Sequence, residues 1–187
     1  MKNLKTIALS IVALVGLSAT AQTKKINTEK STINWVGKKV TGQHEGTIDL
    51  KEGLLIFKDE KVVGGNFVVD MTTINTTDLS GDGKKSLDGH LKSADFFGTD
   101  TFDTATLKFK KIGKKADGIY TIKADMTIKG ITNSVFFDLT VKGEIAMAKV
   151  MVDRTKFDIK YGSGSFFDNL GDKTISDEFE LNVNLAL

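Results

Sequence analysis

The chain has 187 residues, with 26 lysine and arginine residues against 24 aspartate and glutamate residues. This near balance gives no indication of a nucleic-acid partner, and the lack of cysteine excludes disulfides and thiol chemistry. A chain of this length suits one domain with a sizeable hydrophobic core.

The first 21 residues have the pattern of a secretory signal peptide. Lys2 and Lys5 precede an apolar run at residues 7–17 that is too short to span a bilayer, and Ala-Thr-Ala follows at residues 19–21. A membrane anchor is the alternative, and the short run argues against it. Cleavage after Ala21 leaves 166 residues with 24 basic and 24 acidic side chains. We therefore expect a periplasmic or secreted protein with one domain, 22–187, and no membrane span.

Beyond residue 26, apolar and polar residues alternate, as they do in half-buried strands. Strands are expected at 31–36, 47–50, 53–58, 62–72, 106–112, 119–130, 134–143, 147–157 and 175–187. The last stretch is the clearest, since one face is apolar except at Asp177. Short turn-forming stretches separate most of the strands. About eight or nine strands predict an all-β fold, an antiparallel sandwich or barrel.

One segment breaks the alternation. Between residues 82 and 94 the apolar positions lie four and then three residues apart, which predicts a short helix with Asp82 as its N-cap. Asp88 and Lys92 would form an exposed ion pair on its surface. The helix ends in LDGHLKSADFF, a stretch that gathers acids, a histidine and two phenylalanines.

An enzyme is one interpretation of this stretch. His90 would be a general base that Asp88 or Asp95 orients. A nucleophile is missing, however, because the chain has no cysteine and Ser163 and Ser165 lie in a glycine-rich turn without the strand-turn-helix context of a nucleophile elbow. We expect no catalysis.

A metal site is the second interpretation. The chain has two histidines, His44 and His90, which are far apart in sequence and have no recognised ligand spacing. The acidic stretch 78–83 lacks the alternating acids and terminal glutamate of a calcium loop. We expect no resident metal or cofactor.

A structural role is the third interpretation. Four apolar side chains would bury the helix against the sheet: Leu87, Leu91, Phe96 and Phe97. His90 would hydrogen-bond a backbone carbonyl or an acid across the turn.

Three motifs resemble the YceI-like proteins. The first is DGHLKSADFFGTDTFDTATLKF at 88–109, the second is ADMTIKGITNSVFFDL at 124–139, and the third is DRTKFDIKYG at 153–162. Residues 37–46 depart from the family's pattern, which leaves the shape of a cavity mouth open. The resemblance implies an exported, lipocalin-like antiparallel barrel of about eight strands with one short helix insertion. It also implies binding of polyisoprenoids and related long lipids, and a possible homodimer.

An eight-stranded barrel is just wide enough to be filled by side chains or to hold one slender ligand. The resemblance implies the second case, with a long isoprenoid, isoprenoid quinone or fatty ligand held in a channel that strand faces and the helix end line together. The expected lining residues are Trp35, Phe57, Phe67, Val69, Met71, His90, Phe96, Phe97, Phe109, Met126, Ile128, Phe137, Leu139, Met147 and Met151.

Three alternatives stay open. Alternation alone does not distinguish a ligand channel from a filled core, and an error of one residue in register turns a strand over. An outer-membrane barrel would need its lysine- and acid-rich faces to line the lumen. A secreted sandwich that binds carbohydrate or protein would want exposed aromatics, whereas 12 of the aromatic residues are phenylalanines, mostly on apolar faces, with 1 tryptophan and 2 tyrosines.

Overall fold

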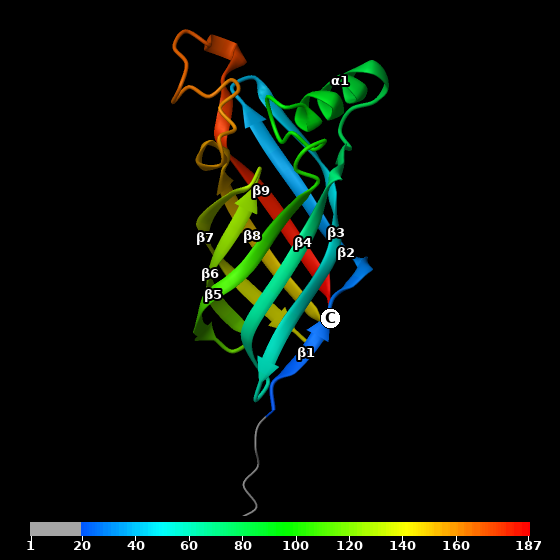
Figure 1. The fold of residues 1–187 in the computed structure, drawn as a ribbon, viewed down its shortest axis with the longest axis vertical. Helices are drawn as coiled ribbons and strands as arrows, with labels where there is room; N and C mark the ends of the chain where they lie inside the picture. The colour runs from blue at the N-terminus through cyan, green and yellow to red at the C-terminus, as the bar shows by residue number, and fades with distance from the viewer. Residues whose placement is uncertain (1–19) are drawn as a thin grey trace, which may run out of the picture.

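Figure 1 shows the computed structural model of the protein, which describes residues 20–187. The strands are β1 (Gln22–Lys25), β2 (Asn27–Lys39), β3 (Gly42–Lys58), β4 (Lys61–Thr76), β5 (Thr104–Ala116), β6 (Ile119–Ile128), β7 (Ile131–Lys142), β8 (Ile145–Asp153) and β9 (Ile175–Ala186). The helices are α1 (Gly81–Lys92) and the 3-10 turns η1 (Arg154–Phe157) and η2 (Gly171–Lys173).

Eight of these strands close into an antiparallel barrel. The order β2-β9-β8-β7-β6-β5-β4-β3 returns to β2, because β3 pairs with both β4 and β2. The ninth strand, β1, pairs with residues 54–57 of β3, so it continues the line of β2 along the same neighbour. Closure removes the free edges that a sandwich would keep. The predicted lipocalin-like barrel with one helix insertion is confirmed.

The connections between strands alternate between two ends of the barrel (Figure 1). Tight turns at 58–61, 116–119 and 142–145 form what we call the hairpin end. The β2–β3 turn, α1, the turn at 128–131 and the long segment 154–174 form the helix end. The two ends therefore differ in length and kind of connection.

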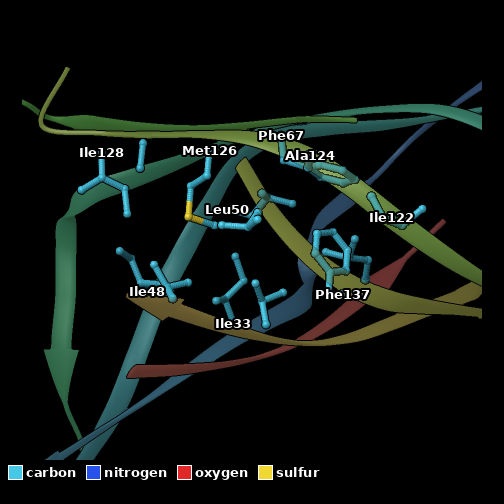
Figure 2. Close-up of a cluster of buried hydrophobic side chains, with 14 of the residues drawn as sticks. Ile33, Ile48, Leu50, Phe67, Ile122, Ala124, Met126, Ile128 and Phe137 are labelled. Atoms are coloured by element: carbon cyan, nitrogen blue, oxygen red, sulfur yellow. The ribbon is translucent and has the colours of Figure 1, made fainter. Parts of the chain in front are cut away.

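Strand β6 illustrates why the alternating sequence forms this barrel. Its even-numbered residues are buried, and they are Tyr120, Ile122, Ala124, Met126 and Ile128. Figure 2 shows Met126 and Ile128 pointing into the barrel toward side chains of β2 and β3, among them Ile33 and Ile48. Burying one such large apolar side chain is worth about 1.5–3 kcal/mol. The predicted inward face of this strand is confirmed.

The hairpin end of the interior is filled with side chains. Leu55, Ile122 and Ala146 are each 0% exposed, and Val62 is 3% exposed. Gly65, which pairs with Leu55, leaves room for the ring of Phe109, since a Cβ at Gly65 would lie 2.7 Å from that ring. The barrel is therefore closed by packing at this end.

The helix α1 begins one residue earlier than predicted and ends two residues earlier, at Gly81 and Lys92. Its N-cap residue is Ser80 rather than Asp82, and no side chain caps the first turn. The predicted Asp88–Lys92 pair is replaced by one between Asp88 and Lys84, 2.7 Å apart. Asp88 also accepts a hydrogen bond from the backbone N–H of Thr76 at 2.8 Å, which ties α1 to the end of β4.

Two strand predictions are corrected. The segments 47–50 and 53–58 belong to one strand, β3, whose pairing with β4 shifts register between Leu50 and Glu52. The strand expected at 147–157 ends at Asp153, whose carboxylate accepts the Thr155 N–H at 3.0 Å and so starts η1. Residues 1–19 of the predicted leader 1–21 lie outside the described residues, so the leader stays a prediction. Within residues 20–187, no helix is long and apolar enough to cross a membrane.

Candidate functional site: an apolar cavity toward the helix end

The barrel contains a cavity of about 180 Å³ toward its helix end. Apolar side chains make up most of its lining, and the polar or charged residues among the lining are Lys38, Thr106, Arg154, Ser176 and Glu178. The fully buried residues of the hairpin end, such as Leu55 and Ile122, do not line it. An apolar cavity of about 150 Å³ already binds benzene. The space therefore suits a slender apolar group.

Most of the expected lining residues meet at this cavity. Those that line it are Trp35, Phe67, Val69, Met71, Phe96, Phe97, Phe109, Met126, Ile128, Phe137 and Leu139. They come from strands around the barrel and from the segment after α1, so closure of the sheet brings them together.

The expected inward orientation of Met147 and Met151 is wrong. These side chains are 42% and 46% exposed on the outer face of β8. The small neighbours Ala148 and Val150 face inward and line the cavity instead. A shift of one residue moves every side chain of a strand to the other face of the sheet. The sequence interpretation of β8 placed the larger methionines inward and was therefore wrong by one residue.

Phe57 and His90 do not line the cavity either. Phe57 lies near the hairpin end, where the ammonium group of Lys24 is 5.7 Å from its ring centre. The His90 ring packs between aromatic rings, 5.5 Å from Phe96 and 4.4 Å from Tyr161. Its buried Nε2 has no hydrogen-bond partner within residues 20–187, so the expected bond from that atom to a carbonyl or acid is absent.

The sequence prediction missed a further set of lining residues. They include Ile33, Ile48, Leu50, Ile74, Leu91, Leu107, Leu181, Val183 and Leu185. Three of these lie on the apolar face of 175–187, which the alternation had already identified. The alternation therefore identified this face as apolar, but the sequence analysis did not place these residues at the cavity.

Aromatic side chains after α1 cover the cavity at the helix end. Phe96 and Phe97 contact each other edge to face at 5.0 Å, and Phe97 contacts Phe179 of β9 at 6.1 Å. Phe96 is 7% exposed, and Leu91 also lines the cavity. These three residues have the predicted structural role at the helix end, whereas Leu87 stays half-buried on α1 and does not line the cavity.

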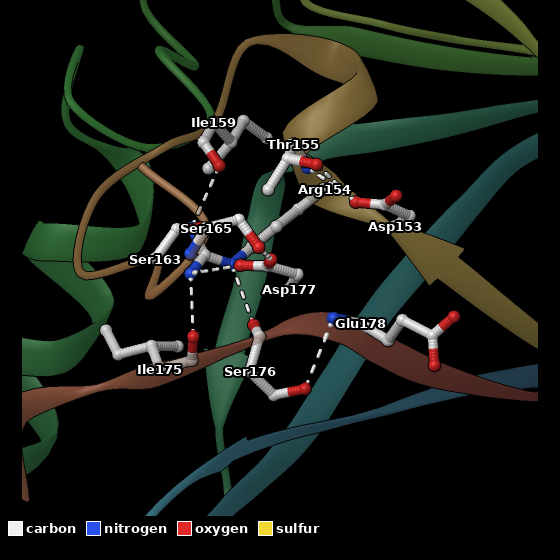
Figure 3. A network of polar contacts seen from close by, with 10 residues as sticks. All are labelled: Asp153, Arg154, Thr155, Ile159, Ser163, Ser165, Ile175, Ser176, Asp177 and Glu178. Atoms are coloured by element: carbon white, nitrogen blue, oxygen red, sulfur yellow. Dashed lines mark hydrogen bonds and ion pairs between the residues drawn. The ribbon is translucent and has the colours of Figure 1, made fainter. Parts of the chain in front are cut away.

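A buried arginine lies beside this cover, and Figure 3 shows its polar contacts. Arg154 is 1% exposed and lines the cavity, and its guanidinium lies 5.7 Å from the ring of Phe96. Its nitrogens donate to three backbone carbonyls: Nε to Ser176 at 2.9 Å, Nη1 to Ile159 at 2.8 Å and Nη2 to Ile175 at 3.1 Å. Burial lowers the pKa of Arg154, but an arginine still stays charged.

Asp177, the exception in the apolar face of β9, balances this charge. Its Oδ1 lies 3.7 Å from Nη2 of Arg154, and its Oδ2 accepts a hydrogen bond from Ser165 Oγ at 2.5 Å. The neighbouring hydroxyls of Ser163 and Ser165, together with Arg154, hold the pKa of Asp177 below its usual value. The carboxylate is therefore ionised at neutral pH.

The residues weighed earlier for chemistry have other partners. Ser163 is 0% exposed, and Ser165 donates to Asp177. His44 contacts Asp78, with Nδ1 2.8 Å from Oδ2. Within residues 20–187, no cluster of three or more histidine, cysteine or acidic side chains is placed to hold a metal ion.

The closed antiparallel barrel and its apolar cavity define a lipocalin-like barrel. The chain belongs to the YceI-like domain family, which matches residues 25–187. The structure resembles that of BcnA from Burkholderia cenocepacia, with a TM-score of 0.66, 20% identity, and coverage of 87% of this chain and 99% of that one. It also resembles a mutant YCEI protein of Campylobacter jejuni, with a TM-score of 0.52, 14% identity, and coverage of 100% and 91%.

Relatives in Staphylococcus aureus match one part of the chain. UPF0312 proteins of strains N315 and Mu50 are 46% identical to it over 56 residues. That segment is 30% of this chain and 30% of each relative. The matched segment therefore spans less than a third of these curated relatives.

Proposed function

We propose that the protein is an exported carrier that sequesters one long apolar chain, an isoprenoid or fatty ligand, in its barrel. The observation that carries the proposal is a cavity lined mainly by apolar side chains, closed by packing at the hairpin end and covered by Phe96 and Phe97 at the helix end. Nearly all of its wall offers no hydrogen-bond partner for a polar group. An apolar chain is therefore the ligand that enters with the smallest desolvation cost.

Binding would need no covalent step. Each methylene that leaves water for the cavity contributes about 0.8 kcal/mol, so a chain of modest length binds well with few polar contacts. Phe67, Phe109 and Phe137 offer rings, and Met71 and Met126 offer flexible side chains that adapt to irregular apolar shapes. We propose binding rather than catalysis, with the periplasm or the cell exterior as the site of action.

A cavity-filling variant tests the proposal. Ala148 lines the cavity, and its neighbour Met147 points outward, so Ala148→Phe fills the space while Met147→Phe is the matched control. A fluorescent fatty probe at about 100 times its Kd should raise the free energy of unfolding of the wild type and of the control by about 2.7 kcal/mol. It should leave Ala148→Phe unchanged in urea titrations.

Native mass spectrometry of protein from its own host should find a co-purified lipid in the wild type and little in Ala148→Phe. A wild type that carries no lipid and binds no fatty or polyprenyl probe contradicts the proposal. Retention of the wild type on a polysaccharide column, with no such binding, would favour the carbohydrate alternative.

A further inference from the structure

The helix end carries several exposed apolar side chains. Tyr161, Phe166 and Phe167 are 48%, 49% and 51% exposed on the segment between η1 and β9. Val40 of the β2–β3 turn is 66% exposed, and its N–H donates to the carbonyl of Thr174 in that same segment at 3.1 Å. We call Val40, Tyr161, Phe166 and Phe167 the aromatic rim.

The rim is held in place by hydrogen bonds. The N–H groups of Phe166 and Phe167 donate to the carbonyl of Ser163 at 3.1 and 3.0 Å, and Ser163 is 0% exposed. The N–H of Ile175 donates to the carbonyl of Gly162 at 2.8 Å, which fastens the segment to β9. Two adjacent phenylalanines thus stay half exposed on a fixed turn, where they offer apolar surface to a partner.

The opposite end of the barrel has a different character. The hairpin end is built from Lys-Asp-Glu-Lys at 58–61, Lys-Lys-Ala-Asp at 114–117 and Lys-Gly-Glu at 142–144. Of the four exposed aromatic side chains within residues 20–187, three belong to the rim, and the fourth, Phe136, lies on the side of the barrel. The hairpin end therefore carries charged turns with the exposed aliphatic residues Val63 and Ile145 beside them, whereas the helix end presents aromatics.

Exposed lysines lie beside the rim. Lys38, Lys39 and Lys173 are exposed at this end, and so are the acids Asp82, Asp95, Asp158, Asp168 and Asp172. The ammonium group of Lys160 lies 5.2 Å from the centre of the Phe166 ring. Aromatic rings beside lysines are the usual composition of a surface that rests in the headgroup region. Because Lys38 also lines the cavity, the rim and the cavity meet at the same end.

We propose that the aromatic rim docks the helix end of the barrel on a lipid bilayer, so that the cavity exchanges its ligand directly with the membrane. The inference rests on the proposed function. Each methylene lowers the equilibrium constant for transfer of a lipid from the bilayer to water by about fourfold. A long chain therefore leaves a bilayer rarely, and a carrier that contacts the membrane can take up the chain without that transfer. The end with the cavity is the end that must make contact.

The experiment compares the full chain with F166S/F167S and with F136S, which removes a still more exposed phenylalanine, at 65%, from the barrel side. All three share one N-terminus, so residues 1–19 contribute equally. Sedimentation with phosphatidylcholine vesicles measures docking. A dansyl-labelled polyprenol, added either from dilute solution or inside the vesicles, separates affinity from loading. Urea midpoints check folding, and the single variant F167S serves if the double variant is unstable.

We expect vesicle partitioning of F166S/F167S to fall by about tenfold to a hundredfold, with slower loading from vesicles. Its affinity for probe in solution should stay within about twofold of wild type, and F136S should behave as wild type. Wild-type loading rates in F166S/F167S, or an equal loss in F136S, would overturn the inference. A wild type that sediments with vesicles but takes up no probe by either route would instead overturn the proposed function.

Discussion

Arg154 is a cation at 1% exposure whose three closest hydrogen-bond partners are backbone carbonyls rather than carboxylates. The sequence identified Arg154 only as part of a motif, because nothing in the alternation indicates which carbonyls a later turn will present. Asp177 was visible as an interruption of the apolar face, but its partner Arg154 lies 23 positions earlier and meets it only through the pairing of β8 with β9. Buried polar pairs of this kind need tertiary structure to be recognised.

Replacing Arg154 with methionine should destabilise the protein by about 3–5 kcal/mol, because the variant leaves buried carbonyls without donors. Urea unfolding followed by circular dichroism measures the change. Lys149→Met is the control, since Lys149 forms an exposed pair with Glu180 at 2.9 Å and such pairs contribute at most about 1 kcal/mol. A similar loss in both variants would contradict the role of Arg154.

The low pKa of Asp177 makes a prediction about acid stability. A carboxyl whose folded pKa is below its unfolded value of about 3.9 contributes stability above that value, and the contribution is lost as the pH falls through the folded pKa. Asp177→Asn should therefore be less stable than wild type at neutral pH, and the two should converge in acid. Urea midpoints between about pH 2 and pH 7 test this.

Asp158 supplies the comparison. The nearby Lys160 ammonium lowers the pKa of Asp158 as well, but the carboxyl is exposed, so salt screens its contribution. In high salt, Asp158→Asn should match wild type at every pH while Asp177→Asn still differs from it. A salt-sensitive effect at Asp177 would mean that the hydroxyls of Ser163 and Ser165 do not stabilise its charge.

At the scale of elements, α1 was predicted within two residues of its observed ends from the spacing of its apolar residues. What holds the helix in place was not predicted. Lys84 donates to the Thr76 carbonyl at 2.7 Å, and Asp88 accepts from the Thr76 N–H, so two side chains of α1 grip one residue of β4. The predicted Asp88–Lys92 pair satisfied helical spacing equally well, and only the position of β4 selects Lys84.

Asp88→Ala should weaken the attachment of α1 to β4, so that the segment covering the cavity opens more often. We expect amide exchange at Thr76 and along α1 to speed up by about tenfold or more, because the Thr76 N–H loses its partner. Hydrogen exchange with mass spectrometry measures it. Asp82→Ala is the control, because Asp82 is exposed and makes no capping bond. Equal acceleration in the control would indicate that charge in α1, rather than the bond to Thr76, matters.

Across the whole molecule, strand number, antiparallel pairing and closure were predictable, because alternation and short turns recur along the chain and the motifs resemble a known family. The cavity was predictable only in part. Faces rich in large residues, as in β6, were assigned correctly, whereas β8 carries alanine and valine inward and methionine outward. Where the barrel is hollow depends on which side chains reach across it, and no local pattern along a strand encodes that.

The space that Gly65 leaves for Phe109 has a consequence for ligand length. Phe109 lines the cavity and its ring contacts Phe67 at 5.6 Å and Phe137 at 6.0 Å, whereas the fully buried Leu55 and Ile122 do not line it. The three rings form a floor on this side of the cavity, and the missing side chain at Gly65 sets the position of the Phe109 ring. Gly65→Ala should push the floor toward the helix end and shorten the longest chain that fits, which a series of fatty probes of increasing length would measure. The hydrogen atom that is the whole side chain of Gly65 would then set the maximum ligand length, as in a molecular ruler.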